Sequence, residues 1–382
     1  MNFWWPGQTV SPRLAVTLLA VILGMTACSE AEEQAIETSD FNVLAQQAQG
    51  YVQAVPGKKL EFPRDHGAHP GYRIEWWYVT ANLEDDDGQQ YGAQWTLFRF
   101  QTRPNHEAAE ANAWQSAQLF MGHFAITTPG DHRAWQRYAR GGLHGDIAQA
   151  GVRAEPFAAW LDDWTLHSSE DAWLPLEVSA SAGDDAISLK LHATGPLILQ
   201  GEGGFSQKHP EGGGSYYYSQ PFLEATGSLT SNGEVIEVSG VAWIDREWSS
   251  QFLQADQSGW DWFSIHLDSG EKLMLFRLRS SEGTGAAGDF RHGVLLAPDG
   301  TRLELDPNEI HMEPLEHEPV AERQLPLRWR IDLPEIGREM EVDALYADQW
   351  MDLDYPYWEG VINVTGSNPG SRGRGYLEMT GY

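Results

Sequence analysis

Cysteine is nearly absent from this chain: its 382 residues include only one, Cys28. A single cysteine excludes internal disulfides and leaves no cysteine nucleophile in the body of the chain. Basic residues are also scarce, with 25 lysines and arginines against 55 aspartates and glutamates, so the formal net charge is −30. Proteins that bind nucleic acids contact phosphates through clusters of basic side chains, and this composition therefore argues against a nucleic-acid partner.

Long helical patterns are missing as well. No long stretch shows a convincing 3.6-residue hydrophobic period. The Gly-x-Ser-x-Gly motif is also missing, so serine-hydrolase chemistry has no support. What the chain has instead is 17 tryptophans and 39 glycines. Aromatic-rich runs separated by glycine-containing turns favour an all-β chain.

The first 28 residues have the pattern of an export signal. Arg13 precedes an apolar run, Leu14 to Met25, that has the length of a signal peptide and is short for a membrane-spanning helix. Met25-Thr-Ala-Cys28 resembles a bacterial lipobox, in which the cysteine is lipidated; the alternative is an ordinary secretory signal with an incidental cysteine. Because Ser29 follows, we expect a lipid anchor at the periplasmic face of the outer membrane, with residues 29–51 as an acidic tether.

Paired β-rich runs predict hairpins along the body. Turns containing Gly with Asp or Asn separate 75–83 from 91–100, 223–230 from 235–244, 260–267 from 272–279, and 294–297 from 301–305. The first and third hairpins share a pattern, in which a Trp-aromatic pair precedes Leu-Phe-Arg. We therefore predict two related antiparallel β-barrels packed together, over residues 52–245 and 246–382, with the change between them near Gly240 to Gly259.

A set of motifs resembles a known family. The motifs are Asp65-His-Gly-Ala-His69, Glu75-Trp-Trp-Tyr78, Ser215-Tyr-Tyr-Tyr-Ser219, Ala242-Trp-Ile-Asp-Arg-Glu-Trp-Ser249, Gly259-Trp-Asp-Trp-Phe263 and Gly375-Tyr-Leu-Glu-Met-Thr-Gly-Tyr382. Together they resemble the AttH-like predicted secreted hydrolases, distant relatives of the carotenoid 1,2-hydratases, from around Val55 to the C terminus. The resemblance implies two tandem lipocalin-like barrels, with the motifs at Asp65, Glu75 and Asp245 near their junction. The hydratase branch carries a histidine in the segment matching 245–248; here Arg246 cannot shuttle a proton.

The stretch Val241 to Phe263 places carboxylates among tryptophans. Desolvation raises a carboxylate pKa and a nearby arginine lowers it, so the stretch is either an acid–base site or a structural ion pair with Arg246. In a strand, Asp245 and Glu247 would share one face and Trp248 would take the other. The candidate catalytic residues are Asp245, Glu247 and Asp261. The candidate ligand-binding residues are Glu75, Trp76, Trp77, Tyr78, Tyr217, Trp243, Trp248, Trp260, Trp262 and Trp358.

These features predict an apolar ligand, isoprenoid or acyl, that sits in the mouth of a barrel. The protein would act on it as a hydratase or hydrolase. The alternative is a non-catalytic lipid carrier serving an envelope transporter, and carbohydrate binding by exposed tryptophans is a third class. An enzyme requires a cavity-facing carboxylate with a raised pKa, whereas a carrier does not. We expect no cofactor and no metal. The residues that could be considered as metal ligands are His66, His69 and His123, or, for Ca²⁺, Asp65, Glu75 and the turn acids Asp85–Asp87.

Overall fold

The computed structural model describes residues 49–104, 116–141, 149–281 and 288–382. They all belong to one compact unit, Asp40–Tyr382. The expected signal segment with Cys28, and the tether as far as residue 48, lie outside the described residues. No helix within the described ranges is long and apolar enough to cross a membrane.

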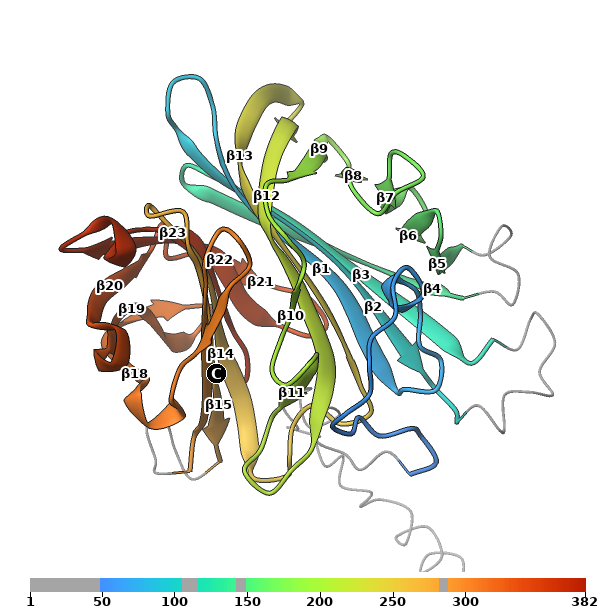
Figure 1. Cartoon of the computed structure of the whole chain (residues 1–382). Coiled ribbons are helices and arrows are strands. Elements are labelled where there is room, and N and C mark those ends of the chain that lie inside the picture. The colour runs from blue at the N-terminus through green and yellow to red at the C-terminus, as the bar shows by residue number, and fades with distance from the viewer. Residues whose placement is uncertain (1–48, 105–115, 142–148, 282–287) are drawn as a thin grey trace, which may run out of the picture. The chain divides into compact units, whose positions relative to one another are not determined.

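The first sheet contains thirteen strands (Figure 1). Its main path runs in the order β4-β3-β2-β1-β13-β12-β9-β8-β7-β6-β5, and β10 and β11 pair with β12. The strands are β1 (Ile74–Glu84), β2 (Gln90–Gln101), β3 (Gln118–Thr128), β4 (Asp131–Arg140), β5 (Ala150–Ala154), β6 (Phe157–Leu161), β7 (Trp164–Ser168), β8 (Leu176–Ala182), β9 (Asp185–Ala193), β10 (Ile198–Leu199), β11 (Phe205–Gln207), β12 (Gly214–Ser231) and β13 (Glu234–Ser249). A short 3₁₀ segment, η1 (Arg64–His66), precedes them.

The second sheet contains ten strands in the order β17-β16-β15-β14-β23-β22-β20-β19-β18, with β21 paired to β22. The strands are β14 (Gln257–Leu267), β15 (Lys272–Ser280), β16 (Phe290–Leu296), β17 (Arg302–Glu304), β18 (His311–Val320), β19 (Arg323–Leu333), β20 (Arg338–Ala344), β21 (Trp350–Met351), β22 (Tyr357–Gly366) and β23 (Gly373–Met379). Its short 3₁₀ segments are η4 (Pro307–Glu309), η5 (Pro334–Ile336) and η6 (Pro369–Ser371). Each sheet curls into a barrel or half-barrel, which confirms the predicted all-β fold with two antiparallel units.

The predicted hairpins form as β1–β2, β12–β13, β14–β15 and β16–β17. The chain leaves the first sheet at Ser249 and enters the second at Gln257. This change lies inside the expected interval, but a boundary between residues 245 and 246 falls within β13. The ladder of β13 with β1 continues through Ser249, and its last four residues therefore belong to the first sheet.

The two sheets share a central pattern. The order β2-β1-β13-β12 in the first corresponds to β15-β14-β23-β22 in the second. Glu75 pairs in register with Arg99 across β1 and β2, and Asp261 pairs with Arg277 across β14 and β15. The shared Leu-Phe-Arg sequence therefore occupies equivalent ladder positions in both sheets, as a structural repeat requires.

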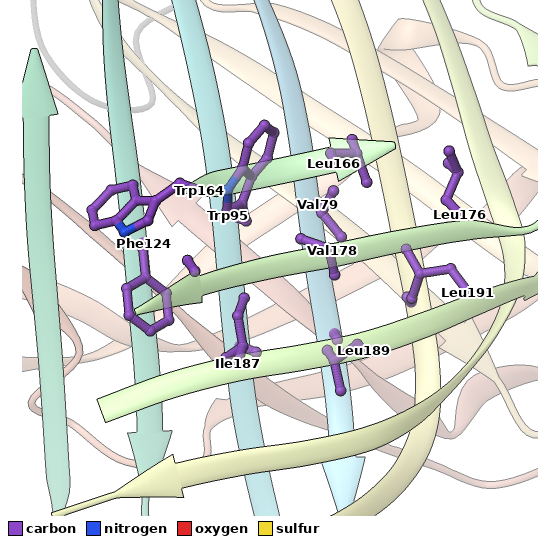
Figure 2. Close-up of a cluster of buried hydrophobic side chains, with 14 of the residues drawn as sticks. Val79, Trp95, Phe124, Trp164, Leu166, Leu176, Val178, Ile187, Leu189 and Leu191 are labelled. Carbon is purple, nitrogen blue, oxygen red and sulfur yellow. The ribbon is translucent and has the colours of Figure 1, made fainter. Parts of the chain in front are cut away.

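Successive side chains along the central strands point alternately into a barrel core and toward the contact between the two sheets. Trp77, Val79 and Leu83 of β1 join the core of the first barrel, while Tyr78 faces a cluster shared by both sheets. Successive strand residues point to opposite faces, so each central strand contributes to two cores. Figure 2 shows the first barrel core, where side chains of β7–β9 lie over those of β1–β3. The second barrel has its own core around Phe263 and Trp329.

Candidate functional site

A cavity of about 130 Å³ lies between the two sheets, on the faces that point away from the barrel cores. By the same kind of measure a water molecule needs roughly 10–15 Å³, so the cavity has room for a small organic group. Because the cavity is partly open to solvent, a longer chain can extend out of it. The mouth of a barrel, where we expected the ligand, is not the position of this cavity. Aromatic side chains dominate its lining. The lining residues are Ile74, Trp76, Tyr78, Thr96, Phe98, Phe100, Met121, His123, Lys208, Tyr217, Asp245, Glu247, Phe252, Leu253, Trp260, Trp262, Phe276, Leu278, Tyr355, Tyr357, Glu378 and Thr380.

Asp245 on β13 faces this cavity and accepts three hydrogen bonds. Ser219 Oγ donates to Oδ1 at 2.5 Å, and Trp243 Nε1 donates to the same oxygen at 2.7 Å. Tyr217 OH donates to Oδ2 at 2.5 Å. Burial raises the pKa of Asp245 to about 7 and Glu247 adds to the rise, although the three hydrogen bonds oppose it. The group can therefore exchange a proton near neutral pH.

Two glutamates face the same cavity from opposite sheets. Glu247, two residues beyond Asp245 on β13, accepts a hydrogen bond from Ser215 and forms an ion pair of 2.9 Å with Lys208 Nζ. Glu378 on β23 accepts a hydrogen bond of 2.7 Å from Trp260 Nε1. Burial raises the pKa of Glu378 to about 7, and the negative charges of the two acids on β13 contribute. The site thus holds two carboxyl groups that are poised to carry a proton.

A further buried acid lies behind the cavity wall. Tyr78 OH donates to Glu359 Oε1 at 2.5 Å, across the contact between β1 and β22. Burial and the neighbouring Glu378 raise the pKa of Glu359 well above its usual range. Tyr357, on the same strand, contacts His123 Nδ1 at 2.9 Å. Burial lowers the pKa of His123 to about 4, so this imidazole is neutral at neutral pH.

Arg246 belongs to a separate network on the opposite face of β13. Its guanidinium pairs with Glu75, which also pairs with Arg99. Burial alone would raise the pKa of Glu75, but the two arginines hold it well below its usual range. His69 stacks on Trp248 with ring centroids 4.0 Å apart and contacts Glu75 Oε2 through Nδ1 at 3.0 Å. The sequence left open an ion pair between Arg246 and Asp245 or Glu247. In the structure Arg246 pairs with Glu75 instead.

Several other candidates also lie outside the cavity lining. Asp261 points toward the second barrel, where it binds Arg277, Arg279 and the Tyr382 hydroxyl. Glu75, Trp77 and Trp248 share the opposite face of the first sheet, and Trp358 belongs to the second barrel core. Trp243 does not line the cavity itself, but it donates a hydrogen bond to Asp245 and packs edge-to-face on the lining residue Trp262. Alternation within strands accounts for these positions, since a sequence motif carries residues of both faces. The candidates that line the cavity are Trp76, Tyr78, Tyr217, Asp245, Glu247, Trp260 and Trp262.

Two charged lining residues, Glu378 and Lys208, were not among the sequence candidates. Glu378 lies within the C-terminal motif that carries the family resemblance. It is two residues beyond Tyr376 on β23, and residues two apart in a strand share a face, so the sequence could have predicted that both point inward. Lys208 follows β11 in a glycine-rich turn, and no local pattern singles it out.

The histidines considered as metal ligands are separated in the structure. His66 stacks on Trp173 with ring centroids 3.7 Å apart, His69 stacks on Trp248, and His123 contacts Tyr357 and Gln136. Within the described ranges, no group of three or more His, Cys, Asp or Glu side chains is arranged to hold a metal ion.

Comparisons with known proteins agree with this architecture. The AttH-like family model matches residues 53–382. A solved structure of an AttH protein from Nitrosomonas europaea is 35% identical, with a TM-score of 0.73, and the match covers 87% of this chain and 99% of that one. No curated protein matches the chain.

More distant structures share the fold. Kievitone hydratase from Nectria haematococca is 14% identical with a TM-score of 0.61, and the match covers 87% of this chain and 98% of that one. CghA is 14% identical with a TM-score of 0.51, covering 88% and 97% of the two chains. The family match over residues 53–382 and the 35% identity to the Nitrosomonas protein show that this chain belongs to the AttH-like family.

Proposed function

We propose that this protein binds an apolar, isoprenoid or acyl ligand in the cavity between its two sheets and adds water to a carbon–carbon double bond of that ligand. The observation that carries the proposal is Asp245, a carboxyl group that faces an aromatic cavity with a pKa raised to about 7. The resemblance in fold to kievitone hydratase is consistent with this reaction class. A simple carrier has no need for such a group.

The site residues can complete a balanced hydration. Oδ2 of Asp245 accepts one hydrogen bond where Oδ1 accepts two, so Oδ2 has room for the acidic proton. Transfer of that proton to one alkene carbon uses the π electrons to form a C–H bond and leaves a cation on the other carbon. A water oxygen bonds to the cation, and the carboxylate of Glu378 takes the released proton. The two carboxyl groups then return to their starting states by exchanging a proton through solvent.

Aromatic side chains around the cavity suit the cationic intermediate. Trp76, Trp260 and Trp262 line it together with Phe98 and Phe276. The faces of indole and benzene rings carry negative electrostatic potential and attract cations, so they lower the energy of a carbocation without bonding to it. Hydrolysis through a covalent acyl intermediate has less support, because the described lining residues include no serine or cysteine.

Isotope labelling tests the proposal directly. The purified protein would be incubated in H₂¹⁸O with geraniol, an isoprenoid alcohol with two double bonds, and separately with oleate. We expect that one of these substrates gives a product whose mass is increased by one molecule of labelled water. We also expect saturable quenching of tryptophan emission. Saturable quenching with no labelled product from either compound would instead favour the carrier alternative. A linear response without saturation would contradict a binding cavity.

We also propose that Cys28 anchors the protein to the periplasmic face of the outer membrane, where apolar ligands partition. This proposal rests on the lipobox-like sequence Met25-Thr-Ala-Cys28. Replacing the cysteine, as Cys28→Ser, should move the protein from the membrane fraction to the soluble periplasmic fraction. Retention of the variant wholly in membranes would contradict lipidation at this residue.

A further inference from the structure

Lys208 is the only lysine or arginine among the described residues that line the cavity. Its Nζ lies 2.9 Å from Glu247 Oε1, 4.3 Å from the centroid of the Phe276 ring and 5.1 Å from that of Tyr217. The side chains of the pair are 9% and 7% exposed. Burying an ion pair costs desolvation energy that its mutual attraction repays only partly. A hydrophobic pair would line an apolar cavity at lower cost, so this charged pair requires an explanation.

The surrounding chain holds Lys208 in position. Its carbonyl accepts a hydrogen bond of 2.9 Å from Gln257 Nε2, at the start of β14. Its amide donates to Gly213 O at 3.1 Å, which closes the turn between β11 and β12. Gly213 has φ +86°, and a Cβ there would lie 2.8 Å from Gln254 Nε2, so the turn favours glycine. Lys208 is thus fixed by contacts to both sheets.

The ion pair, whose two residues line the cavity, retains hydrogen-bonding capacity. An ammonium group carries three N–H donors, and the described residues supply it with one side-chain oxygen, on Glu247. That carboxylate can accept further hydrogen bonds through its second oxygen. A donor and an acceptor side by side match a hydroxyl group, whose oxygen accepts and whose hydrogen donates.

The register of β13 sets the distance between this pair and the proposed acid. Asp245 pairs with Tyr78, and Glu247 pairs with Trp76, two residues nearer the strand end at Ser249. Residues two apart on a strand lie on one face, separated by about 7 Å. A ligand that contacts both positions therefore has its polar group at about that distance from its reacting double bond.

We propose that the Lys208–Glu247 pair recognises a hydroxyl group on the ligand, so that the substrate class is an unsaturated isoprenoid or acyl alcohol and not a plain hydrocarbon. The inference rests on the proposed apolar binding site and adds to it the identity of the ligand's polar end. The pair orients the chain so that its double bond lies at Asp245. Both members are positioning residues, because they hold the unreacting end of the ligand.

A matched pair of ligands tests this inference without an activity assay. Geraniol and 2,6-dimethylocta-2,6-diene differ only by the hydroxyl group, and tryptophan quenching measures the binding of each. Hydrogen bonds to charged groups contribute roughly 1.5–3 kcal/mol, so we expect geraniol to bind the native protein at least about tenfold more tightly. In Lys208→Met this preference should fall to about twofold or less, while the affinity for the hydrocarbon stays within a factor of about two.

Two controls separate recognition from folding. Lys190→Met removes an exposed lysine on β9 that pairs with Glu177 at 3.3 Å, and it should leave the preference unchanged. Geranyl methyl ether accepts a hydrogen bond but donates none, so Glu247→Gln should affect its binding less than that of geraniol. A native protein that binds both compounds equally, or a preference that survives in Lys208→Met, would overturn the inference. The hydrocarbon has no hydroxyl group, so its binding to the native protein tests the apolar cavity alone. If the native protein did not bind the hydrocarbon, the proposed function would fail, and this result is distinct from equal binding of the two compounds.

Discussion

Asp245 and Arg246 are neighbours in the sequence and belong to opposite faces of β13. Asp245 faces the cavity between the sheets, where Tyr217, Ser219 and Trp243 donate hydrogen bonds to it. Arg246 points the other way and pairs with Glu75. The chemistry proposed for the cavity and the ion pairing of the first barrel are therefore separable by mutation, although the motif joins them in one run of residues.

The first prediction concerns the proposed acid. Asp245→Asn keeps the size of the side chain and removes its exchangeable acidic proton. Hydration should fall by about two to four orders of magnitude, the usual contribution of general acid–base catalysis, while ligand quenching of tryptophan emission persists. Rates and binding curves measured on one preparation check this. Unchanged turnover in a folded variant would remove Asp245 from the mechanism.

The second prediction concerns the buried ion pair. Arg246→Met leaves Glu75 with Arg99 alone, and breaking a buried pair costs about 3 kcal/mol or more, so chemical denaturation should show a loss of that size. Arg328→Met is the matched control, because Arg328 forms ion pairs at the surface with 43% of its side chain exposed. Surface pairs contribute about 0–1 kcal/mol. Equal losses of unfolding free energy in the two variants would show that the buried Arg246 pair stabilises the protein no more than a surface pair does.

The pH dependence of the same pair has a fixed sign. The pKa of Glu75 is held well below its usual range in the folded protein. The stabilising contribution of Glu75 is therefore present above the pKa that its carboxyl has in the unfolded chain, and it is lost as the pH falls through the lower pKa of the folded state. The loss of unfolding free energy caused by Arg246→Met should accordingly be larger at pH 7 than at pH 4.

The third prediction concerns pH and Asp245. Its pKa is about 7 in the folded protein against about 3.9 in an unfolded chain. The folded state therefore holds a proton that the unfolded state releases, so this contribution to stability is full below about pH 4 and declines until about pH 7. Between pH 5 and pH 8 the free energy of unfolding should fall by roughly 3 kcal/mol through this group.

Denaturation curves at the two pH values, compared between the native protein and Asp245→Asn, isolate that contribution. The variant should show a shallower decline. Hydration catalysed by the native protein should also fall above about pH 7, as the acid loses its proton. Parallel stability profiles for the two proteins would mean that the carboxyl group titrates outside this range.

The fourth prediction separates two adjacent tryptophans. Trp76 lines the cavity, and its ring lies 4.3 Å from that of Phe252. Trp77 is 1% exposed in the first barrel core, with the Arg246 guanidinium 3.8 Å from its ring. Trp76→Ala should weaken ligand binding with a modest effect on stability. Trp77→Ala should cost about 3–5 kcal/mol of stability, as for other buried aromatics, and leave the cavity wall in place. Calorimetry and quenching titrations on both variants measure the two effects, and a reversed pattern would contradict the assignment of faces.

The sequence determined the features that depend on local chemistry. Turns containing Gly with Asp or Asn between β-rich runs fixed the hairpins, and the two-residue period placed Asp245 and Glu247 on one face with Trp248 on the other. The shared Leu-Phe-Arg segments indicated two related units, which the equivalent ladder pairs of Arg99 and Arg277 confirm. These properties follow from neighbours along the chain, because turn geometry and side-chain alternation involve only a few residues.

Only the tertiary structure decided which faces meet. Both faces of the central strands are apolar enough to be buried, so hydropathy could not show that the cavity lies between the sheets and not within a barrel. Glu378 is 131 positions beyond Glu247, and Lys208 is 39 before it, yet the curl and packing of the sheets bring all three to one cavity. Arg246 has carboxylates at both neighbouring positions, and the pleat turns it away from them toward Glu75, 171 residues away. Such pairings depend on strand order and sheet curvature, which arise from the packing of the whole domain and leave no local pattern in the sequence.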